Sequence, residues 1–426
     1  MDAEKLQKKY RDLIEKDLMR FWEKAFDTEK GGVFTCFTND GSRLISTDKY
    51  VWSQGRMLWV LSRLCEMCGR GLVSIDRAGY ERQAEKTFRL IADHALLGDG
   101  GVCAYLLDRD GNKKESISGK GFYTSYFVDC FVIMGMMEYA RVFGKSDAAE
   151  LGLRLFDKMM TYLGRGEIRS EPYPVKKGFA PHSESMILCN VCCVVRDALR
   201  KLGHPRAEEF AEAAKRHMKK ILFGFYDPKL GLIREMVDRS GAFGNSVLER
   251  HIAPGHCNEC MWFCMDAVED GDAAILERID RIVEKNMAVG WDREYGGVYR
   301  FLDRDGNAPH GGRSGDPYED LILDTWDTKL WWVHAETLYT TLRCYLRTGK
   351  PAFGGWYRRT EEYVFRHFPN PNREIGEWIQ ILDRQGRPLD KVVALPVKDP
   401  YHILRDTMLI VELLEKYRTP AHGIFG

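Results

Sequence analysis

The sequence has no excess of charge of either sign and no long apolar run. Its 426 residues include 63 basic and 63 acidic side chains, which cancel when histidine is neutral. Nucleic-acid and anionic-membrane proteins that bind through charge carry a basic excess, so this balance argues against both partners. No stretch reaches the ~18 consecutive apolar residues of a membrane span, and the first residues lack the apolar core of a secretory signal. We therefore expect a soluble, cytoplasmic protein.

The sequence also gives no sign of a P-loop nucleotide site or of a metal site. No Gly-x-x-x-x-Gly-Lys-Ser/Thr loop is present, so the sequence carries no P-loop for a nucleotide. The twelve cysteines lie mostly in apolar helical stretches. Two Cys-x-x-Cys pairs, Cys65/Cys68 and Cys257/Cys260, have the spacing of a four-cysteine zinc site, but both fall within continuous helical patterns and not in tight turns. We predict buried, reduced thiols and no metal site.

What the sequence does contain is a repeated segment. Each copy begins with glycine, continues as a short alternating stretch and ends in an Asp-x-x-Gly turn, which is typical of a small β-hairpin. Clear copies begin at Gly32, Gly101, Gly231, Gly297 and Gly376, although the first copy has threonine in place of the aspartate. A degenerate copy at Gly166 fills the gap between the second and the third. The repeat therefore predicts six units.

Two kinds of helical pattern separate the copies. Residues 80–92 have one buried face, formed by Ala84, Thr87, Phe88 and Ile91, whereas residues 123–137 are apolar nearly all round. One exposed-type helix followed by one enclosed-type helix, six times, predicts an all-α (α/α)6 barrel with short β-hairpins capping one end. Because no single pair can bury its own faces, we expect residues 1–426 to form one domain.

In such a barrel each inner helix begins shortly after a hairpin, so the six helix starts converge on the mouth. The predicted starts are Tyr50-Val51-Trp52, Gly121-Phe122-Tyr123, Pro181-His182-Ser183, Pro254-Gly255-His256, Leu330-Trp331-Trp332 and Pro400-Tyr401-His402. Polar and aromatic side chains at these positions are the candidates for chemistry.

The first start places Trp52, Arg56 and Trp59 on one helix face. A guanidinium flanked by two indoles suits a sugar, because the rings cover its apolar face and the fork binds its oxygens. The alternative is an arginine that pairs with a structural carboxylate. The fourth start sets His256 and Glu259 one turn apart, where the carboxylate can orient the imidazole or hold a substrate hydroxyl.

The last two starts repeat this pattern. Trp332 and Glu336 share a face at i, i+4, while His334 points elsewhere and is a secondary candidate. His402 and Arg405 lie one turn apart. Burying such charged groups together without a function is costly, so their recurrence at one end of a ring favours an active site.

The remaining histidines are weaker candidates. His182 begins the third inner helix and is a candidate for the pocket. The others are predicted to be solvated: His94, His204, His217, His251, His310, His367 and His422.

The motifs at residues 50–56, 254–259, 329–336, 376–378 and 401–402 together resemble the N-acylglucosamine 2-epimerase (renin-binding protein) family. The resemblance runs from about residue 10 to about 415 and implies an (α/α)6 barrel. It also implies that His256 and His402 are the acid and base on opposite sides of the sugar and that Arg56 binds ring oxygens. Glu259, Trp332 and Glu336 match pocket positions, and Tyr50, His334 and Arg405 complete the candidate substrate-binding residues.

The resemblance further implies a reaction. Inversion at C2 of an aldose requires ring opening, removal of the C2 proton to give an enediolate, and return of a proton from the other face. Imidazoles titrate near ~6.5, so one can act as base while the other acts as acid, and Arg56 can stabilise the oxyanion. No metal or redox cofactor is required. ATP is implied as an allosteric activator, and the assembly as a homodimer.

Several alternatives stay open at this point. Relatives that act on cellobiose or isomerise sugars carry a further histidine in the third inner helix, and residues 183–190 contain none. This favours interconversion of N-acetylglucosamine and N-acetylmannosamine over an isomerase or epimerase of mannose, sulfoquinovose or cellobiose. A glycosidase with paired carboxylates and a non-catalytic sugar-binding protein are the other hypotheses. The loop at residues 310–316 is rich in glycine, and we expect it to influence specificity.

Overall fold

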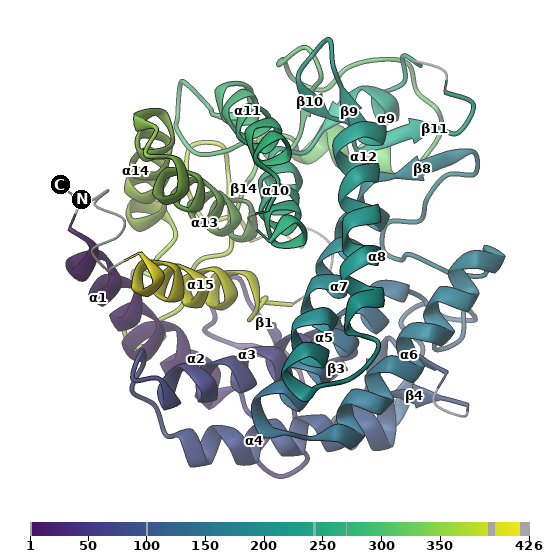
Figure 1. Ribbon diagram of the computed structural model, residues 1–426, viewed down its shortest axis with the longest axis vertical. Helices are drawn as coiled ribbons and strands as arrows, with labels where there is room; N and C mark the ends of the chain where they lie inside the picture. Colours follow the sequence, from purple (N-terminus) through teal and green to yellow (C-terminus); the bar gives the residue numbers. More distant parts are fainter. Residues whose placement is uncertain (1, 99–100, 242–243, 270, 391–396, 418–426) are drawn as a thin grey trace.

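The computed structural model describes residues 2–98, 101–241, 244–269, 271–390 and 397–417. Helices form two concentric layers (Figure 1). In the inner layer α3 packs on α5, α5 on α7, α7 on α10, α10 on α13 and α13 on α15, and α15 returns to α3. The inner helices are α3 (Val51–Gly69), α5 (Tyr126–Phe143), α7 (His182–Leu202), α10 (Pro254–Val268), α13 (Trp331–Thr348) and α15 (His402–Lys416).

The outer helices pack on the inner ring. Those that follow an inner helix in the chain pack on it: α4 (Arg77–Leu90), α6 (Ser146–Arg165), α8 (Ala207–Lys219), α11 (Ala273–Gly290) and α14 (Pro351–His367). The N-terminal α1 (Ala3–Leu13) packs instead on α15, so the first and the last described helices meet and close the ring (Figure 1). The shorter segments are η1 (Ile14–Leu18), α2 (Met19–Lys24), η2 (Ile91–Ala95), η3 (Lys220–Phe225), α9 (Val247–Arg250) and α12 (Tyr318–Thr325).

The burial of the helices follows the two predicted patterns. On α4 the buried side chains include Ala84, Thr87 and Phe88, the face that the periodicity predicted. On α5 almost every residue from Tyr126 to Ala140 is buried, because this helix is enclosed on both sides. One large apolar cluster runs through both layers. The result is a helical barrel of the α/α type, and the sheets among the described residues contain at most three strands, none of them closed.

Two glycines set the distance between α3 and α5. A Cβ on Gly55 would lie 2.6 Å from the carbonyl oxygen of Phe131, and one on Gly135 would lie 2.3 Å from that of Gly55. Any larger residue would force the helices apart, since real Cβ atoms do not approach so closely. The close crossing brings Phe131 next to Arg56, which follows Gly55 on α3.

Short strands link neighbouring units before the inner helices begin. β3 (Lys49–Tyr50) pairs with β6 (Leu106–Leu107), β8 (Phe179–Pro181) with β11 (Met236–Asp238), β12 (His251–Ile252) with β13 (Leu302–Asp303), and β14 (Lys329–Leu330) with β15 (Ile381–Leu382). In each case the strand that precedes an inner helix pairs with the next copy of the repeat. The pairing ties consecutive units together where the inner helices start.

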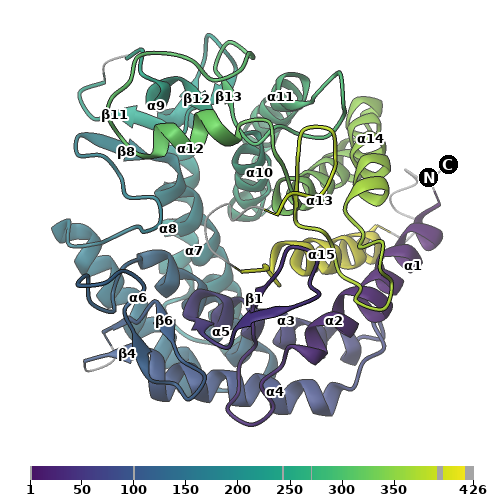
Figure 2. The ribbon, with the colours of Figure 1, turned by 180° about the vertical axis from the view of Figure 1, so that it is seen from behind.

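The predicted hairpins form only in part. β1 (Cys36–Phe37) pairs with β2 (Leu44–Ser46), and β6 with β7 (Lys113–Lys114), each across the turn that ends its copy; the segment around β1 lies in front of α3 in Figure 2. β4 (Leu96–Leu97) pairs with β5 (Val102–Cys103), and β9 (Tyr226–Asp227) with β10 (Leu232–Ile233), joining an outer helix to its copy. The degenerate copy at Gly166 forms no strand, only a single bridge between Ser125 and Ser170.

Each of these inner helices except α5 begins inside the three-residue start predicted for it. Helix α5 begins at Tyr126, after the predicted start at 121–123. The Glu115 side chain accepts hydrogen bonds from the backbone N–H groups of Gly119 and Gly121, and both glycines have positive φ. These bonds hold the segment as a loop, so the helix starts later.

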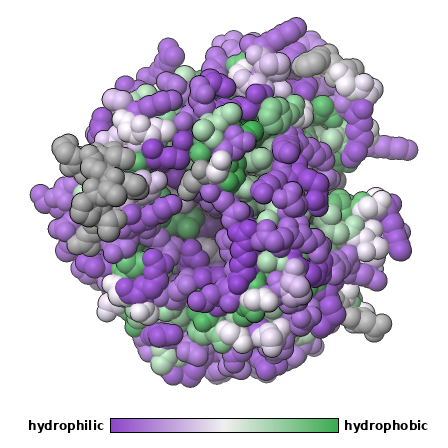
Figure 3. All heavy atoms as spheres, viewed as in Figure 1, coloured by the Kyte–Doolittle hydropathy of each residue, from purple (hydrophilic) through white to green (hydrophobic). Residues whose placement is uncertain are grey.

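None of the described helices combines the length and apolar character needed to cross a membrane. The face seen in Figure 3 is largely hydrophilic and hollowed near its centre. All twelve cysteines are unpaired, and eleven are buried. The prediction of buried thiols is thus confirmed except at the half-buried Cys68.

Candidate active site

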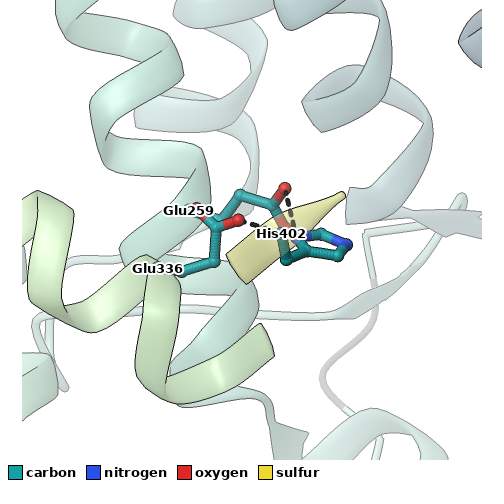
Figure 4. Close-up of side chains that lie close together, drawn as sticks. All are labelled: Glu259, Glu336 and His402. Carbon is teal, nitrogen blue, oxygen red and sulfur yellow. Dashed lines mark hydrogen bonds and ion pairs between the residues drawn. The ribbon is translucent and has the colours of Figure 1, made fainter. Parts of the chain in front are cut away.

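Four charged side chains from three inner helices meet at the start of α15. His402 Nδ1 lies 2.7 Å from Glu336 Oε1 of α13 and 3.8 Å from Glu259 Oε1 of α10 (Figure 4). Arg405, one turn after His402, donates to Glu259 Oε1 at 2.7 Å and also to Glu336. All four side chains are buried. The structure therefore brings together residues that the sequence separates by up to 146 positions.

Glu336 is ionised in this cluster although it is buried. Burial alone would raise the pKa of its carboxyl, but the charge of Arg405 and the hydrogen bonds from His402 and Trp262 hold that pKa at about 2. Trp262 Nε1 donates to Glu336 Oε2 at 2.7 Å. An ionised carboxylate at His402 Nδ1 requires a proton on that nitrogen, so Nε2 is the ring nitrogen left for a substrate.

The second predicted catalytic imidazole lies at the start of α10. The His256 ring packs at 5.0 Å from the Trp332 ring, and the same indole lies 5.9 Å from the His402 ring. Both imidazoles thus contact one aromatic surface. A Cβ on Gly255 would lie 2.8 Å from Trp332, so glycine at this position allows α10 to approach that indole.

The carboxylate that orients His256 is Glu235, not the predicted Glu259. His256 Nδ1 lies 3.0 Å from Glu235 Oε2, and a quarter of the His256 side chain is exposed. Glu259 shares a helix face with His256, but its carboxylate is taken up by Arg405. Sequence spacing showed that His256 and Glu259 share a helix face, but it did not show that Arg405 binds the Glu259 carboxylate.

Glu235 lies between two histidines. His182 begins α7 as predicted, is fully buried, and places Nδ1 3.5 Å from Glu235 Oε1 and Nε2 3.3 Å from Cys260 Sγ. Burial raises the pKa of Glu235, but the charge of His256 and the hydrogen bond from His182 outweigh it and hold that pKa well below its usual range. Sequence reasoning missed Glu235.

A signal for Glu235 was present in the repeat. At its fifth position the clear copies carry Cys36, Tyr105, Glu235, Phe301 and Gln380. An acid among mostly apolar residues, next to the strand that pairs with β8, was a sign of a polar environment at that point.

Arg56 forms a second part of the site. Its Nη1 donates to Asp399 Oδ1 at 3.1 Å, and its guanidinium lies 3.8 Å from the centre of the Phe131 ring and 5.0 Å from that of Trp52. The prediction of two flanking indoles is wrong at Trp59, which packs on Tyr401 instead. The close crossing of α3 and α5 supplies Phe131 as the second ring.

Asp399 connects this part to His402. It accepts from Trp331 Nε1 at 3.1 Å and from the backbone N–H of His402 at 3.0 Å. Burial opposes its ionisation, but the charges of Arg56 and His402 keep the pKa of Asp399 below its ordinary value. Asp399 precedes α15 as helix-capping aspartates do, so its position was visible in the sequence while its link to Arg56 was not.

Of the other two predicted substrate-binding residues, Tyr50 lies on the Arg56 side of the site and His334 lies outside it. Tyr50 packs edge-on against Tyr105, whose ring contacts Trp52, and burial raises the pKa of Tyr50 to about 12. His334 does not join the cluster. Its Nδ1 lies 2.7 Å from the Leu330 carbonyl and its Nε2 accepts from the Val298 N–H at 3.0 Å, so both ring nitrogens are used.

Burial explains the state of two histidines outside the cluster. It lowers the pKa of His334 to about 3, so this ring is neutral. His251 was predicted to be solvated, which is wrong: only 1% of it is exposed, and its Nδ1 bonds the Leu248 carbonyl beneath Tyr318. The helix α12, which sequence reasoning did not place, covers this point. His422 lies outside the described residues.

Two groups of side chains have the spacing of metal ligands. The first is Glu259, Glu336 and His402 (Figure 4). Arg405 already forms ion pairs with both carboxylates, so a cation would have to displace a buried guanidinium. The second is Asp303, Asp305 and His310, where Arg250 occupies Asp303 at 2.7 Å. Neither donor set offers free carboxylates, and the Cys-x-x-Cys pairs lie inside α3 and α10.

Comparison with known proteins was consistent across sequence and structure. The sequence model of the family described as N-acylglucosamine 2-epimerase (GlcNAc 2-epimerase) matches residues 32–405. The N-acylglucosamine 2-epimerase of Bos taurus is 30% identical over 423 residues, covering 95% of this chain and 91% of the relative. That of Mus musculus is 28% identical over 415 residues, covering 94% and 91%.

Among solved structures, the cellobiose 2-epimerase of Bacillus thermoamylovorans superimposes with a TM-score of 0.77. The alignment covers 96% of this chain and 99% of that one at 16% identity. At such low identity the likeness concerns the α/α-barrel fold.

Proposed function

The chain belongs to the N-acylglucosamine 2-epimerase family, and from that premise we propose that it interconverts N-acetylglucosamine and N-acetylmannosamine. It is an isomerase of the racemase and epimerase class that acts on carbohydrates. The glycosidase and binding-protein hypotheses are therefore set aside. The observation that carries the proposal is the placement of two carboxylate-oriented imidazoles, His256 and His402, against one indole.

In the proposed mechanism one imidazole removes the proton from C2 of the open-chain sugar and the other returns a proton from the opposite face. Glu235 holds the Nδ1 proton of His256 and Glu336 that of His402, so both rings direct Nε2 at the substrate. The carboxylates also stabilise the imidazolium that each ring becomes when it has taken a proton. The roles of base and acid exchange with the direction of the reaction.

Charge in the enediolate needs a donor, and Arg56 is the proposed one. Its guanidinium is held by Asp399 and packs against the rings of Phe131 and Trp52, which fixes it without removing all of its N–H groups. A preorganised donor acts mainly on the charge that develops in the transition state. Trp332, between the imidazoles, is the proposed platform for the apolar face of the sugar.

Glu259 and Arg405 are the proposed partners of the sugar hydroxyls. Glu259 Oε1 accepts from Arg405, which leaves its other oxygen to hold a sugar hydroxyl. His334 is withdrawn from the substrate-binding set because its ring nitrogens are occupied. Tyr50 stays in the set only as a group on the Arg56 side.

Similarity favours the N-acyl substrate over an unmodified sugar. The relatives named N-acylglucosamine 2-epimerase reach 30% identity, against 22% for the cellobiose 2-epimerase of Bacteroides fragilis. His182 faces Glu235 and Cys260 in place of a substrate position, so the third inner helix supplies no further imidazole to the sugar. A 2-epimerase or aldose–ketose isomerase acting on mannose or cellobiose is the alternative.

Product analysis tests the proposal. The protein is incubated in heavy water with N-acetylmannosamine, N-acetylglucosamine, mannose or cellobiose, with and without ATP, and proton NMR follows C1 and C2. We expect the two N-acetyl sugars to interconvert with deuterium at C2 and no ketose. Turnover confined to mannose or cellobiose, or a ketose product, would contradict the N-acyl assignment.

Other properties stay proposals alongside it. We assign the ring to the (α/α)6 class and treat residues 1–426 as one catalytic domain, which the continuous apolar cluster supports. Activation by ATP, a homodimer and a cytoplasmic location remain predictions from the sequence. The NMR experiment with and without ATP covers the first, and sedimentation covers the second.

A further inference from the structure

Arg300 is a buried arginine whose partners are all neutral. Only 4% of it is exposed, and its Nη1 donates to the Thr325 hydroxyl at 2.9 Å. Its guanidinium lies 4.8 Å from the centre of the Phe301 ring, and the Tyr173 hydroxyl faces it. No carboxylate forms an ion pair with Arg300 in the part of the chain that the structure describes.

Other buried arginines of this protein are neutralised. Arg56 pairs with Asp399, Arg405 with Glu259, and Arg196 with Asp197. A buried charge without a partner costs several kcal/mol, and a protein retains one only where something else compensates. Burial accordingly lowers the pKa of Arg300, although a guanidinium keeps its proton throughout the physiological range. The environment of Arg300 therefore favours a further acceptor, and none of the described carboxylates fills that role.

Arg300 lies close to the catalytic centre. β13 begins two residues after it, and Leu302 pairs with Ile252 in antiparallel register. The same register brings residue 300 towards residue 254, where α10 starts, two positions before His256. The Tyr318 ring packs 5.6 Å from that of His251. Arg300 and Glu235 both lie close enough to Tyr318 for their charges to act on its hydroxyl. The guanidinium thus lies on the His256 side of the site.

Two loops form an aromatic wall around this arginine. The rings of Tyr173 and Tyr318 lie 5.4 Å apart, and Tyr318 and Phe301 lie 6.0 Å apart. The loop that carries Tyr173 is tied to the loop before α12 by Lys176 Nζ, which donates to the Ser314 carbonyl at 2.7 Å. Residues 310–316, which the sequence singled out for specificity, therefore help to position the wall.

We propose that Arg300, with the rings of Tyr173, Phe301 and Tyr318, binds the acyl group of the sugar, the guanidinium donating to the amide carbonyl and the rings packing on the methyl. This inference rests on the proposed function. The acyl group is attached to C2, the carbon that lies between the two imidazoles in the proposed mechanism, and Arg300 lies on the His256 side of that carbon. A charged N–H donor beside three aromatic rings suits a group with a carbonyl and a methyl.

The charge of Glu235 decides against an anionic substituent. This carboxylate is held ionised and lies near Tyr318 and His256, so a second negative charge beside it would be repelled. A neutral carbonyl accepts from Arg300 without that repulsion. The subsite therefore favours N-acyl sugars over uronates or sugar phosphates.

Binding of non-reacting alditols tests the subsite without turnover. Calorimetry compares N-acetylglucosaminitol, glucitol and gluconate on the full-length protein and on Arg300→Met. We expect Arg300→Met to weaken N-acetylglucosaminitol by about 10- to 100-fold, the range of a hydrogen bond from a charged donor, and to leave glucitol unchanged. Equal weakening of both alditols, or none, would overturn the proposal, as would tighter binding of gluconate than of N-acetylglucosaminitol.

Stability separates a ligand-binding role from a structural one. Because Arg300 has no charge partner, Arg300→Met should keep or raise the Tm of the free protein. The control is Arg384→Met, which removes a guanidinium paired with Asp292 at 2.9 Å; it should lower the Tm and leave the preference for the acyl alditol intact. A Tm that falls more for Arg300→Met than for Arg384→Met would assign Arg300 to the fold.

The same data keep the two proposals apart. If the wild-type protein epimerises no N-acetyl sugar yet binds N-acetylglucosaminitol through Arg300, the proposed function fails and the acyl subsite stands. If it epimerises N-acetyl sugars and Arg300→Met leaves both binding and kcat/KM unchanged, the subsite fails and the function stands.

Discussion

Replacement of Glu235 by glutamine removes the charge behind His256 while keeping its shape. In the wild type Glu235 Oε2 accepts from His256 Nδ1 at 3.0 Å, and 5% of Glu235 is exposed, so solvent screens this contact little. The amide still offers an oxygen to the Nδ1 proton, but a neutral acceptor stabilises an imidazolium less than a carboxylate does. The variant therefore tests the carboxylate as a charge and not as a spacer.

The size of the effect follows from the bond that is weakened. Hydrogen bonds to charged groups contribute about 1.5–3 kcal/mol and neutral ones about 0.5–1.5 kcal/mol. The difference between the two, about 1–2.5 kcal/mol in the transition state, lowers kcat/KM by about 5- to 70-fold. Since the imidazolium of His256 loses its partner, the acidic limb of the pH–rate profile should also move to lower pH.

The assay is the initial rate of deuterium incorporation at C2, measured by proton NMR across pH 5–9. The matched control is Glu138→Gln, which neutralises another buried carboxylate, paired with Arg63 and Arg141 near the end of α5. That variant should lose stability but keep the shape of the pH profile. The account of His256 would be refuted if Glu235→Gln left both the rate and the acidic limb unchanged, or if both variants moved the limb equally.

Three further predictions concern other parts of the molecule. Burial raises the pKa of Asp129 to about 7, so the folded state binds an extra proton between the ordinary value of 3.8 and 7, and stability falls as pH rises through this window. Between pH 5 and pH 8 the fall should be about 3 kcal/mol, and Asp129→Asn should abolish it in urea titrations at those two pH values. Arg56→Lys should lower kcat/KM about 10- to 100-fold with an unchanged Tm, because an ammonium lacks the fork held between Phe131 and Asp399; full activity would remove Arg56 from the oxyanion role. Trp332→Ala should lower kcat more than Trp332→Phe does, since both imidazoles lean on that ring, and equal kcat values would exclude such support.

The hydrophobic periodicity of the sequence predicted the two helical layers of the fold but not every element. The enclosed pattern of α5 and the one-sided pattern of α4 reflect how each helix is buried, so they could be predicted. The late start of α5 could not, because it depends on Glu115 bonding two glycine N–H groups in a loop. Strand pairing between repeat copies was also missed, since short strands give no pattern that identifies a partner.

The site was predictable up to the point where distant charges meet. His256, His402, Glu336 and Arg405 were visible because each lies at a helix start that the ring brings inward. Glu235 and Asp399 lie outside the helices, and their partners are set by contacts 21 and 343 positions away in the sequence.

The central claim is that His256 and His402 serve opposite faces of one carbon. The most direct measurement is the exchange of the C2 proton in heavy water by His256→Asn and His402→Asn, starting separately from N-acetylglucosamine and from N-acetylmannosamine. Each variant should lose epimerisation and still exchange the proton of one epimer, and the two variants should retain opposite epimers. Loss of exchange from both epimers in both variants, or epimerisation that survives either substitution, would contradict the two-imidazole mechanism.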